Sequence, residues 1–213
     1  MPGACAMNPD SEMSNEDVEI VSQTALYDGF FKMNQYRLRH KLFKGEWSGE
    51  IVREMFERGH AVAVLPYDPI RQQFVLIEQF RLGAMATRDN PWLIEVVAGV
   101  IDKQESAEQV CIREAEEEAD IEISDLVKAI SYLSSPGGTT ERIDVFVAKV
   151  DASEAGGVHG LDHEGEDIKV HVVDEHEAMN WLESGKIDNA ASIIALQWFA
   201  LNKQRVIDEW NRT

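Results

Sequence analysis

The sequence is poor in positive charge. Its 20 Lys and Arg residues face 39 Asp and Glu residues, which gives a formal net charge of -19 at pH 7 and a pI near 4.6. Proteins that bind nucleic acids or anionic membranes normally present a basic face. The composition therefore argues against both partners, and an anionic ligand would need another source of positive charge.

Cysteines and long apolar runs are also scarce. The two cysteines are Cys5 and Cys111, so a disulfide framework has little support and a reducing, cytoplasmic location is expected. No apolar run approaches the roughly 20 residues that cross a bilayer. Residues 1–14 have neither a basic start nor an apolar centre, so they do not resemble a signal peptide and are predicted to form a flexible leader.

What the sequence does contain is a mixture of strand and helix patterns. Between residues 18 and 43, apolar and polar residues alternate, which predicts a small antiparallel sheet. From about residue 57, apolar strands are interspersed with helical patterns. We predict an α+β fold with a leader at 1–14, an N-terminal β-sheet domain at 15–56 and a main domain at 57–213.

Three local patterns in the main domain give specific expectations. The stretch WLIEVVAGVI predicts one strand, and Ser106 with Gln109 three residues later forms a capping box at the start of the next helix. A long loop, DASEAGGVHGLDHEGED, precedes the strand IKVHVV. Two helices follow, one over residues 174–184 and one from Asn189 to about Trp210, with Asp188 as the expected cap.

The helix after Ser106 carries the run REAEEEAD. Glu114 and Glu118 are four residues apart and share one helix face, with Glu117 beside them. An isolated acidic run is usually only a solvated surface. Here Gly99 permits a close approach of the preceding strand, and carboxylate oxygens converging from a helix and a turn suit Mg²⁺ or Mn²⁺. A metal ion would also supply the positive charge that the composition lacks.

This arrangement resembles the Nudix box. After Gly99 come five residues, Glu105, seven residues and then the run from Arg113 to Ile121, so that six of the seven fixed positions match. A spaced pattern of this length is a strong signal. Asp120 is the exception, because the family has a glycine there that ends the helix in a left-handed conformation. The exchange is expected to cost on the order of 1 kcal/mol without removing a ligand.

The similarity extends from about Asp17 to the end of the chain. The segments LIEQFR, PWLIEVVAG, SSPGGTTER and HGLDHEGED resemble bacterial ADP-ribose pyrophosphatases, a group within the Nudix hydrolases. The resemblance implies a Nudix α/β/α sandwich with a small N-terminal antiparallel β-sheet domain that is exchanged across a homodimer. It also implies an adenine site shared between the subunits and hydrolysis of ADP-ribose to AMP and ribose 5-phosphate.

The resemblance further implies a role for individual residues. Two or more Mg²⁺ ions, with Mn²⁺ as a possible substitute, would have the following ligands: the Ala98 carbonyl, Glu114, Glu118 and Glu166. Glu164, on the acidic loop, would be the catalytic base, with Glu117 and Arg113 supporting the ligands. The residues that would bind the substrate are Phe30, Arg53, Arg81 and Glu141.

Several alternatives remain open at the level of sequence. Phe30 alone would more often be a core residue, Arg81 a surface charge, and the acidic loop a solvated segment. The substrate could be another nucleoside diphosphate derivative, such as a nucleotide sugar or NADH, because pocket details set that choice. A noncatalytic module that senses ADP-ribose is a further alternative, although such a protein would be expected to lose some of the glutamates.

Overall fold

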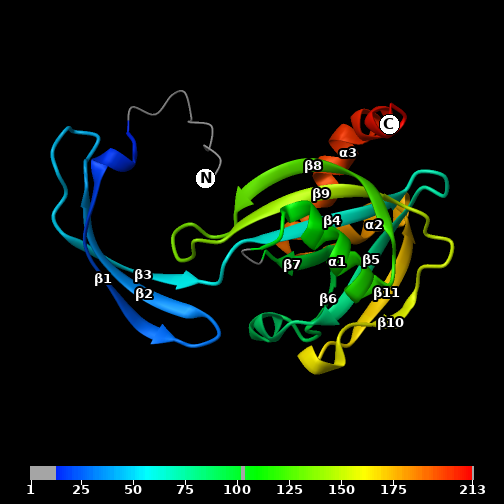
Figure 1. Ribbon diagram of the computed structural model, residues 1–213, viewed down its shortest axis with the longest axis horizontal. Coiled ribbons are helices and arrows are strands. Elements are labelled where there is room, and N and C mark those ends of the chain that lie inside the picture. Colours follow the sequence, from blue (N-terminus) through cyan, green and yellow to red (C-terminus); the bar gives the residue numbers. More distant parts are fainter. Residues whose placement is uncertain (1–12, 102–103, 213) are drawn as a thin grey trace. The chain divides into compact units, whose positions relative to one another are not determined.

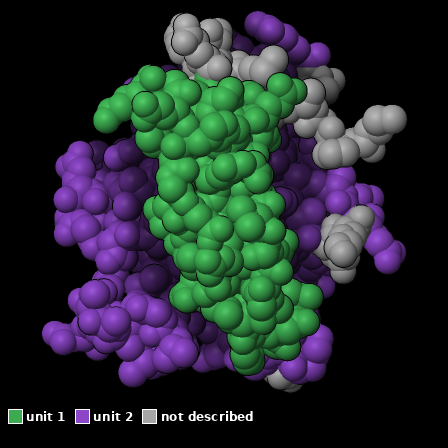
Figure 2. All heavy atoms as spheres, turned by 90° about the vertical axis from the view of Figure 1, so that its left-hand side faces the viewer, with its two compact units in different colours: residues 1–58, 135–140 green, residues 59–134, 141–213 purple. Residues whose placement is uncertain are grey.

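The structure, a computed structural model, describes residues 13–101 and 104–212. Cys5 and most of the predicted leader therefore lie outside the described residues. The chain divides into two compact units (Figure 2). Unit 1 contains the chain up to Arg58 together with Ser135–Thr140, and unit 2 contains Gly59–Ser134 and Glu141–Thr213. Among the described residues, no helix combines the length and the apolar character that crossing a membrane requires.

Unit 1 is the small antiparallel sheet expected from the sequence. Its strands, in spatial order, are β1 (Val18–Asp28), β2 (Lys32–His40) and β3 (Ile51–Glu57). A short 3-10 helix, η1 (Asn15–Asp17), precedes β1. The segment Ser135–Thr140 joins this unit through β3, where the Phe56 amide donates to the Gly138 carbonyl at 2.8 Å and the Thr140 hydroxyl donates to Glu57 at 2.7 Å.

Unit 2 is built on one mixed sheet of eight strands. Six of them follow the order β10-β11-β5-β4-β9-β8, while β6 pairs with β5 and β7 pairs with β4. Strands β4 and β9 pair in parallel. The strand bounds are β4 Ala61–Asp68, β5 Gln73–Phe80, β6 Trp92–Glu95, β7 Val97–Val100, β8 Ile123–Leu133, β9 Arg142–Val150, β10 Gly157–His159 and β11 Ile168–Asp174.

Helices cover both faces of this sheet (Figure 1). Helix α1 (Ala107–Ala119) packs on one face, and helices α2 (Glu175–Glu183) and α3 (Ala190–Trp210) pack on the other. Short 3-10 helices also occur at η2 (Leu82–Ala86) and η3 (Asp162–Glu164). The expected α/β/α sandwich is thus confirmed.

Strand β4 shows why the sheet sits at the centre. All eight of its residues are buried, as expected for a strand covered on both faces. Because side chains alternate along a strand, Val62 and Val64 face the core under α1. Leu65 and Tyr67 face the core under α2 and α3, where the Tyr67 ring lies 4.6 Å from that of Phe199.

The prediction of a single strand over WLIEVVAGVI is wrong, because this stretch forms two strands, β6 and β7. Glu95 pairs with Ile77 of β5, whereas Val97 pairs with Val64 of β4. Between them, the Val96 amide donates to the hydroxyl of Ser192 on α3 at 3.0 Å. The side chain of a distant helix therefore takes the hydrogen bond that would have continued the strand.

Two smaller expectations also change. The cap of α3 is Asn189, whose side chain accepts from the Ser192 amide at 3.1 Å, whereas Asp188 pairs with Arg88 at 2.6 Å. The predicted loop before β11 contains the short strand β10 and the 3-10 helix η3. That helix includes His163 and Glu164, the first two residues of the acidic HEGED segment.

Candidate active site

Helix α1 presents the acidic run, and its start is fixed as the sequence predicts. The Ser106 hydroxyl accepts from the Gln109 amide at 3.2 Å, and the Gln109 side chain accepts from the Ser106 amide at 2.8 Å. This confirms the capping box. On the apolar face of α1, Val110, Cys111 and Ala115 are fully buried. Burial strongly raises the pKa of the Cys111 thiol, which is consistent with a packing role.

Asp120 ends the helix in the left-handed conformation, at φ 50° and ψ 44°. Its amide donates to the Glu116 carbonyl at 3.0 Å, and the Ile121 amide donates to the Ala115 carbonyl at 3.3 Å. The first of these two bonds is the one that closes helices ending in a left-handed residue, which is commonly glycine. The aspartate therefore preserves the helix end that the Nudix glycine would give.

Glu118 is the most deeply buried carboxylate of the run, with 3% of the residue exposed. One oxygen accepts from the Ala98 amide of β7 at 3.1 Å, and the other accepts from the Gln79 side chain of β5 at 3.4 Å. Burial, together with the nearby charges of Glu114 and Glu166, raises the pKa of Glu118 to about 8, against the opposing effect of the Ala98 hydrogen bond. A cation beside this carboxylate would reverse that shift.

Glu114 lies directly against the backbone of Gly99. A Cβ atom on Gly99 would be only 2.0 Å from an oxygen of Glu114, so no other residue type fits without moving the carboxylate. This confirms the close approach predicted for Gly99. Burial raises the pKa of Glu114 to about 6, with Arg113 opposing the shift.

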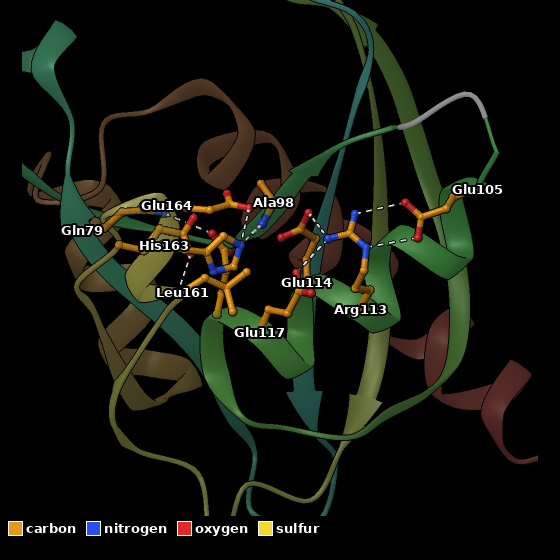
Figure 3. A network of polar contacts seen from close by, with 11 residues as sticks. Gln79, Ala98, Glu105, Arg113, Glu114, Glu117, Leu161, His163 and Glu164 are labelled. Atoms are coloured by element: carbon orange, nitrogen blue, oxygen red, sulfur yellow. Dashed lines mark hydrogen bonds and ion pairs between the residues drawn. The ribbon is translucent and has the colours of Figure 1, made fainter.

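Arg113 connects three of the carboxylates (Figure 3). It donates to both oxygens of Glu105, at 3.1 and 3.2 Å, to Glu114 at 2.9 Å and to Glu117 at 2.8 Å. These bonds, above all those to Glu105, raise the pKa of Arg113. The arginine thus orders the acidic face and offsets part of its repulsion.

The acidic loop contributes two more carboxylates. Glu166 accepts from the Leu161 amide at 3.1 Å. Gly160 has φ 104°, and a Cβ there would be 2.7 Å from the Cβ of Glu166, so glycine is needed at this turn. Glu164 is the more accessible of the two, with 58% of its side chain exposed, and lies 3.7 Å from the His163 ring.

The donor atoms of this site suit a hard divalent cation. Within the described parts of the chain, no three His, Cys, Asp or Glu side chains lie close enough together to form a ready-made metal site. Glu114, Glu118 and Glu166 are nonetheless near enough for the charge of Glu166 to raise the pKa of both others. Carboxylate oxygens that lie near one another, one buried and two half-buried, suit Mg²⁺ or Mn²⁺ as ligands.

The predicted substrate residues are divided between the units. In unit 2, Arg81 donates to Glu95 at 2.9 Å, and Glu141 is buried just before β9. In unit 1, Arg53 is exposed on β3. Phe30 is 94% exposed, so it is not a core residue of this chain.

The sequence did not point to two polar residues beside the carboxylates. Gln79 contacts Glu118, and Glu95 contacts Arg81. Both lie in segments that support the family resemblance, LIEQFR and PWLIEVVAG. The one available signal was a polar residue within an otherwise apolar strand, which by itself does not identify a partner.

Fold and site together define an α/β/α sandwich that presents clustered carboxylates from one helix and one loop. A model of the NUDIX domain matches residues 57–202. The chain belongs to the Nudix family, as the box resemblance indicated.

Individual relatives are similar over most of the chain. An ADP-ribose pyrophosphatase of Escherichia coli (strain K12) is 53% identical over 194 residues, which cover 91% of this chain and 93% of the relative. A GDP-mannose pyrophosphatase of Enterobacter sp. (strain 638) is 34% identical over 194 residues, covering 87% and 96%. A solved structure of an ADP compounds hydrolase shares the fold, with a TM-score of 0.69 and 19% identity over 91% of this chain and 98% of that one.

Proposed function

We propose that this protein hydrolyses the pyrophosphate bond of ADP-ribose to give AMP and ribose 5-phosphate. The observation that carries the proposal is the set of clustered carboxylates on α1 and the acidic loop, in a chain 53% identical to an ADP-ribose pyrophosphatase. The lower identity of 34% to a GDP-mannose pyrophosphatase favours ADP-ribose over a nucleotide sugar.

Divalent metal ions are the proposed cofactor, with Mg²⁺ the expected ion, Mn²⁺ a substitute, and two or more ions bound. Ligands would come from the Ala98 carbonyl, Glu114, Glu118 and Glu166. Metal ions in such a site neutralise phosphate oxygens and activate water. Arg113 and Glu117 keep the carboxylates on α1 ordered through the 2.8 Å contact between them and the bonds from Arg113 to Glu105.

The remaining chemistry falls to groups of the chain itself. Glu164, exposed on the acidic loop, would accept the proton of the attacking water. Arg81 would contact the pyrophosphate and offset its charge. In the proposal Phe30, Arg53 and Glu141 bind the adenosine end of the substrate. The exposure of Phe30 supports its use as a stacking surface.

We also propose a homodimer in which the N-terminal sheet contacts the second chain. All eleven residues of β1 are exposed. Its large exposed apolar side chains are Val18, Ile20, Val21, Leu26 and Tyr27. In the described residues β1 pairs only with β2, and apolar edge strands of this length are normally covered. We place this dimer in the cytoplasm, without nucleic acid or membrane partners.

The proposal is tested by product analysis on a substrate panel. The purified protein is incubated with Mg²⁺ and ADP-ribose, GDP-mannose, another nucleotide sugar or NADH. The proposal expects the highest kcat/KM for ADP-ribose, with AMP as product. A higher value for a sugar nucleotide would identify that compound class as the substrate, and tight ADP-ribose binding without turnover under any divalent metal would indicate a sensing module.

A matched pair of variants connects the activity to the carboxylates. Glu118→Gln should lower kcat about 100-fold or more, because several kcal/mol of metal-derived stabilisation are lost. Glu116→Gln changes an exposed glutamate on the same helix and should leave kcat within about twofold of the wild type. Equal rates in the two variants would contradict the metal assignment.

A further inference from the structure

Gln79 is a buried amide on a strand whose other buried residues are apolar. It is 7% exposed, and Val75 and Ile77, which precede it on the same face of β5, are fully buried. A buried polar side chain is costly unless its hydrogen bonds are made. A specific interaction must therefore offset the cost of placing an amide there.

The Glu118 carboxylate provides that interaction, and a second carboxylate, Glu95, lies nearby. The Gln79 amide nitrogen donates to one oxygen of Glu118 at 3.4 Å. Gln79, together with the larger effect of Arg81, also opposes the rise in the pKa of Glu95 that burial causes. Glu95 pairs with Ile77 across β5 and β6, so it is a diagonal neighbour of Gln79 on one face. Since a glutamine amide has two N–H donors, it can serve both carboxylates.

These contacts hold Glu118 at both of its oxygens. The Ala98 amide donates to the other oxygen at 3.1 Å, so the carboxylate is bound between β5 and β7. Glu95, a neighbour of Gln79 on the same face, is itself held by Arg81 at 2.9 Å. The carboxylate plane is thereby defined by backbone and side-chain donors of the chain.

We propose that Gln79 is a positioning residue that orients the Glu118 carboxylate for divalent metal binding. The proposal rests on the proposed metal site and concerns how the protein prepares it. A neutral donor suits this position for a physical reason. A lysine or arginine would compete with the cation for Glu118, and a carboxylate would add repulsion to a site that already contains three.

The test measures metal binding without substrate. Mn²⁺ affinity is determined by electron paramagnetic resonance for the wild type, Gln79→Leu and Gln79→Met. Loss of a residue that orients a metal ligand typically weakens affinity or activity by roughly 10- to 100-fold, and we expect a loss of this size in both variants. With ADP-ribose, kcat should fall by a similar factor, while KM should change less than about threefold.

Gln73→Leu is the matched control. Gln73 lies on the same strand and donates to the carboxylate of Asp174 at 2.9 Å, so this variant also removes one amide-to-carboxylate bond. Its Mn²⁺ affinity should equal that of the wild type. Gln79→Met retains an unbranched side chain of similar length, which keeps the test valid if Gln79→Leu does not fold.

The outcomes are distinct. Wild-type Mn²⁺ affinity in a folded Gln79 variant, an equal loss in Gln73→Leu, or a wild-type protein that binds no Mn²⁺ would each overturn the positioning role. If the wild type binds Mn²⁺ but does not cleave ADP-ribose, the proposed function fails, while the comparison of metal affinities still decides the role of Gln79.

Discussion

Gly99 leaves the space that Glu114 occupies, and it offers a direct test of the site at the scale of one residue. The Cβ of an alanine there would be 2.0 Å from an oxygen of Glu114, a distance that forces the carboxylate to move. We expect Gly99→Ala to retain the fold and to lower kcat/KM for ADP-ribose by roughly tenfold or more, because about 1 Å of misplacement can cost 100-fold. Steady-state kinetics at saturating Mg²⁺ measures the loss.

Gly83→Ala is the control for this substitution. Gly83 has no heavy atom within 4 Å of the position of an added Cβ, and the variant should keep wild-type kinetics. Equal activity of Gly99→Ala and the wild type would show that the position of Glu114 does not matter for turnover.

The raised pKa values of Glu118 and Glu114, about 8 and about 6 against an ordinary 4.5, predict how stability depends on pH in metal-free protein. Both groups bind protons more tightly in the folded state. Their contribution to stability is therefore fully present below pH 4.5 and is lost as the pH rises toward 8. For Glu118 the loss is on the order of a few kcal/mol.

Urea unfolding in EDTA between pH 5 and pH 9 measures this dependence. Glu118→Gln removes the group, so the stability of the wild type relative to this variant should fall as the pH rises. Mg²⁺ should restore the stability of the wild type at pH 8, because it binds the ionised carboxylates of the folded state. A relative stability that does not change with pH would contradict the assignment of Glu118.

The sequence predicts some neighbours in the site but not others. Gly99 and the carboxylates of α1 are close in the chain, and their spacing predicts their proximity. Gln79 is 39 residues from Glu118, and only the pairing of β5 with the other strands brings it near α1. A polar residue in a strand signals that a partner exists, but tertiary structure determines which partner it is.

At the scale of elements, the end of α1 tests the single departure from the Nudix box. Asp120 holds φ 50°, where glycine has no steric penalty. Asp120→Gly should therefore stabilise the protein, by at most about 1 kcal/mol, and leave kcat unchanged. Chemical denaturation and kinetics measure the two effects.

Asp120→Ala provides the opposite substitution. Alanine carries a Cβ and lacks the short polar group that helps aspartate adopt this conformation, so the expected order of stability is Gly, then Asp, then Ala. A glycine variant less stable than the wild type would show that the aspartate side chain contributes an interaction beyond the helix end.

Local sequence signals predicted the other helix and strand ends only where the interacting residues are close in the chain. The capping box at Ser106 depends on residues three apart and was predicted correctly. The break at Val96 depends on Ser192 of α3, almost a hundred residues later in the chain, so the apolar run WLIEVVAGVI gave no sign of it. At the start of α3, Asp188 and Asn189 are both good capping residues. Asp188 instead forms an ion pair with Arg88, and Asn189 caps the helix.

At the scale of the whole molecule, exposed β1 predicts self-association. Sedimentation should show two chains per particle at micromolar concentration. Leu26→Glu places a charge on the exposed apolar strand and should shift the protein to the monomer, because burying an unpaired charge in an interface is costly. Leu201→Glu changes a leucine of α3 that is 86% exposed, and it should leave the assembly intact. A monomeric wild type would contradict the dimer.

The most direct test of the central claim is product analysis of ADP-ribose hydrolysis in ¹⁸O-labelled water with Mg²⁺. The proposed reaction predicts AMP and ribose 5-phosphate in equal amounts, with one labelled oxygen in the phosphate of one of them and no turnover in EDTA. The position of the label identifies the phosphorus that water attacks. Absence of AMP, or products without label, would contradict hydrolysis of the pyrophosphate bond by this protein.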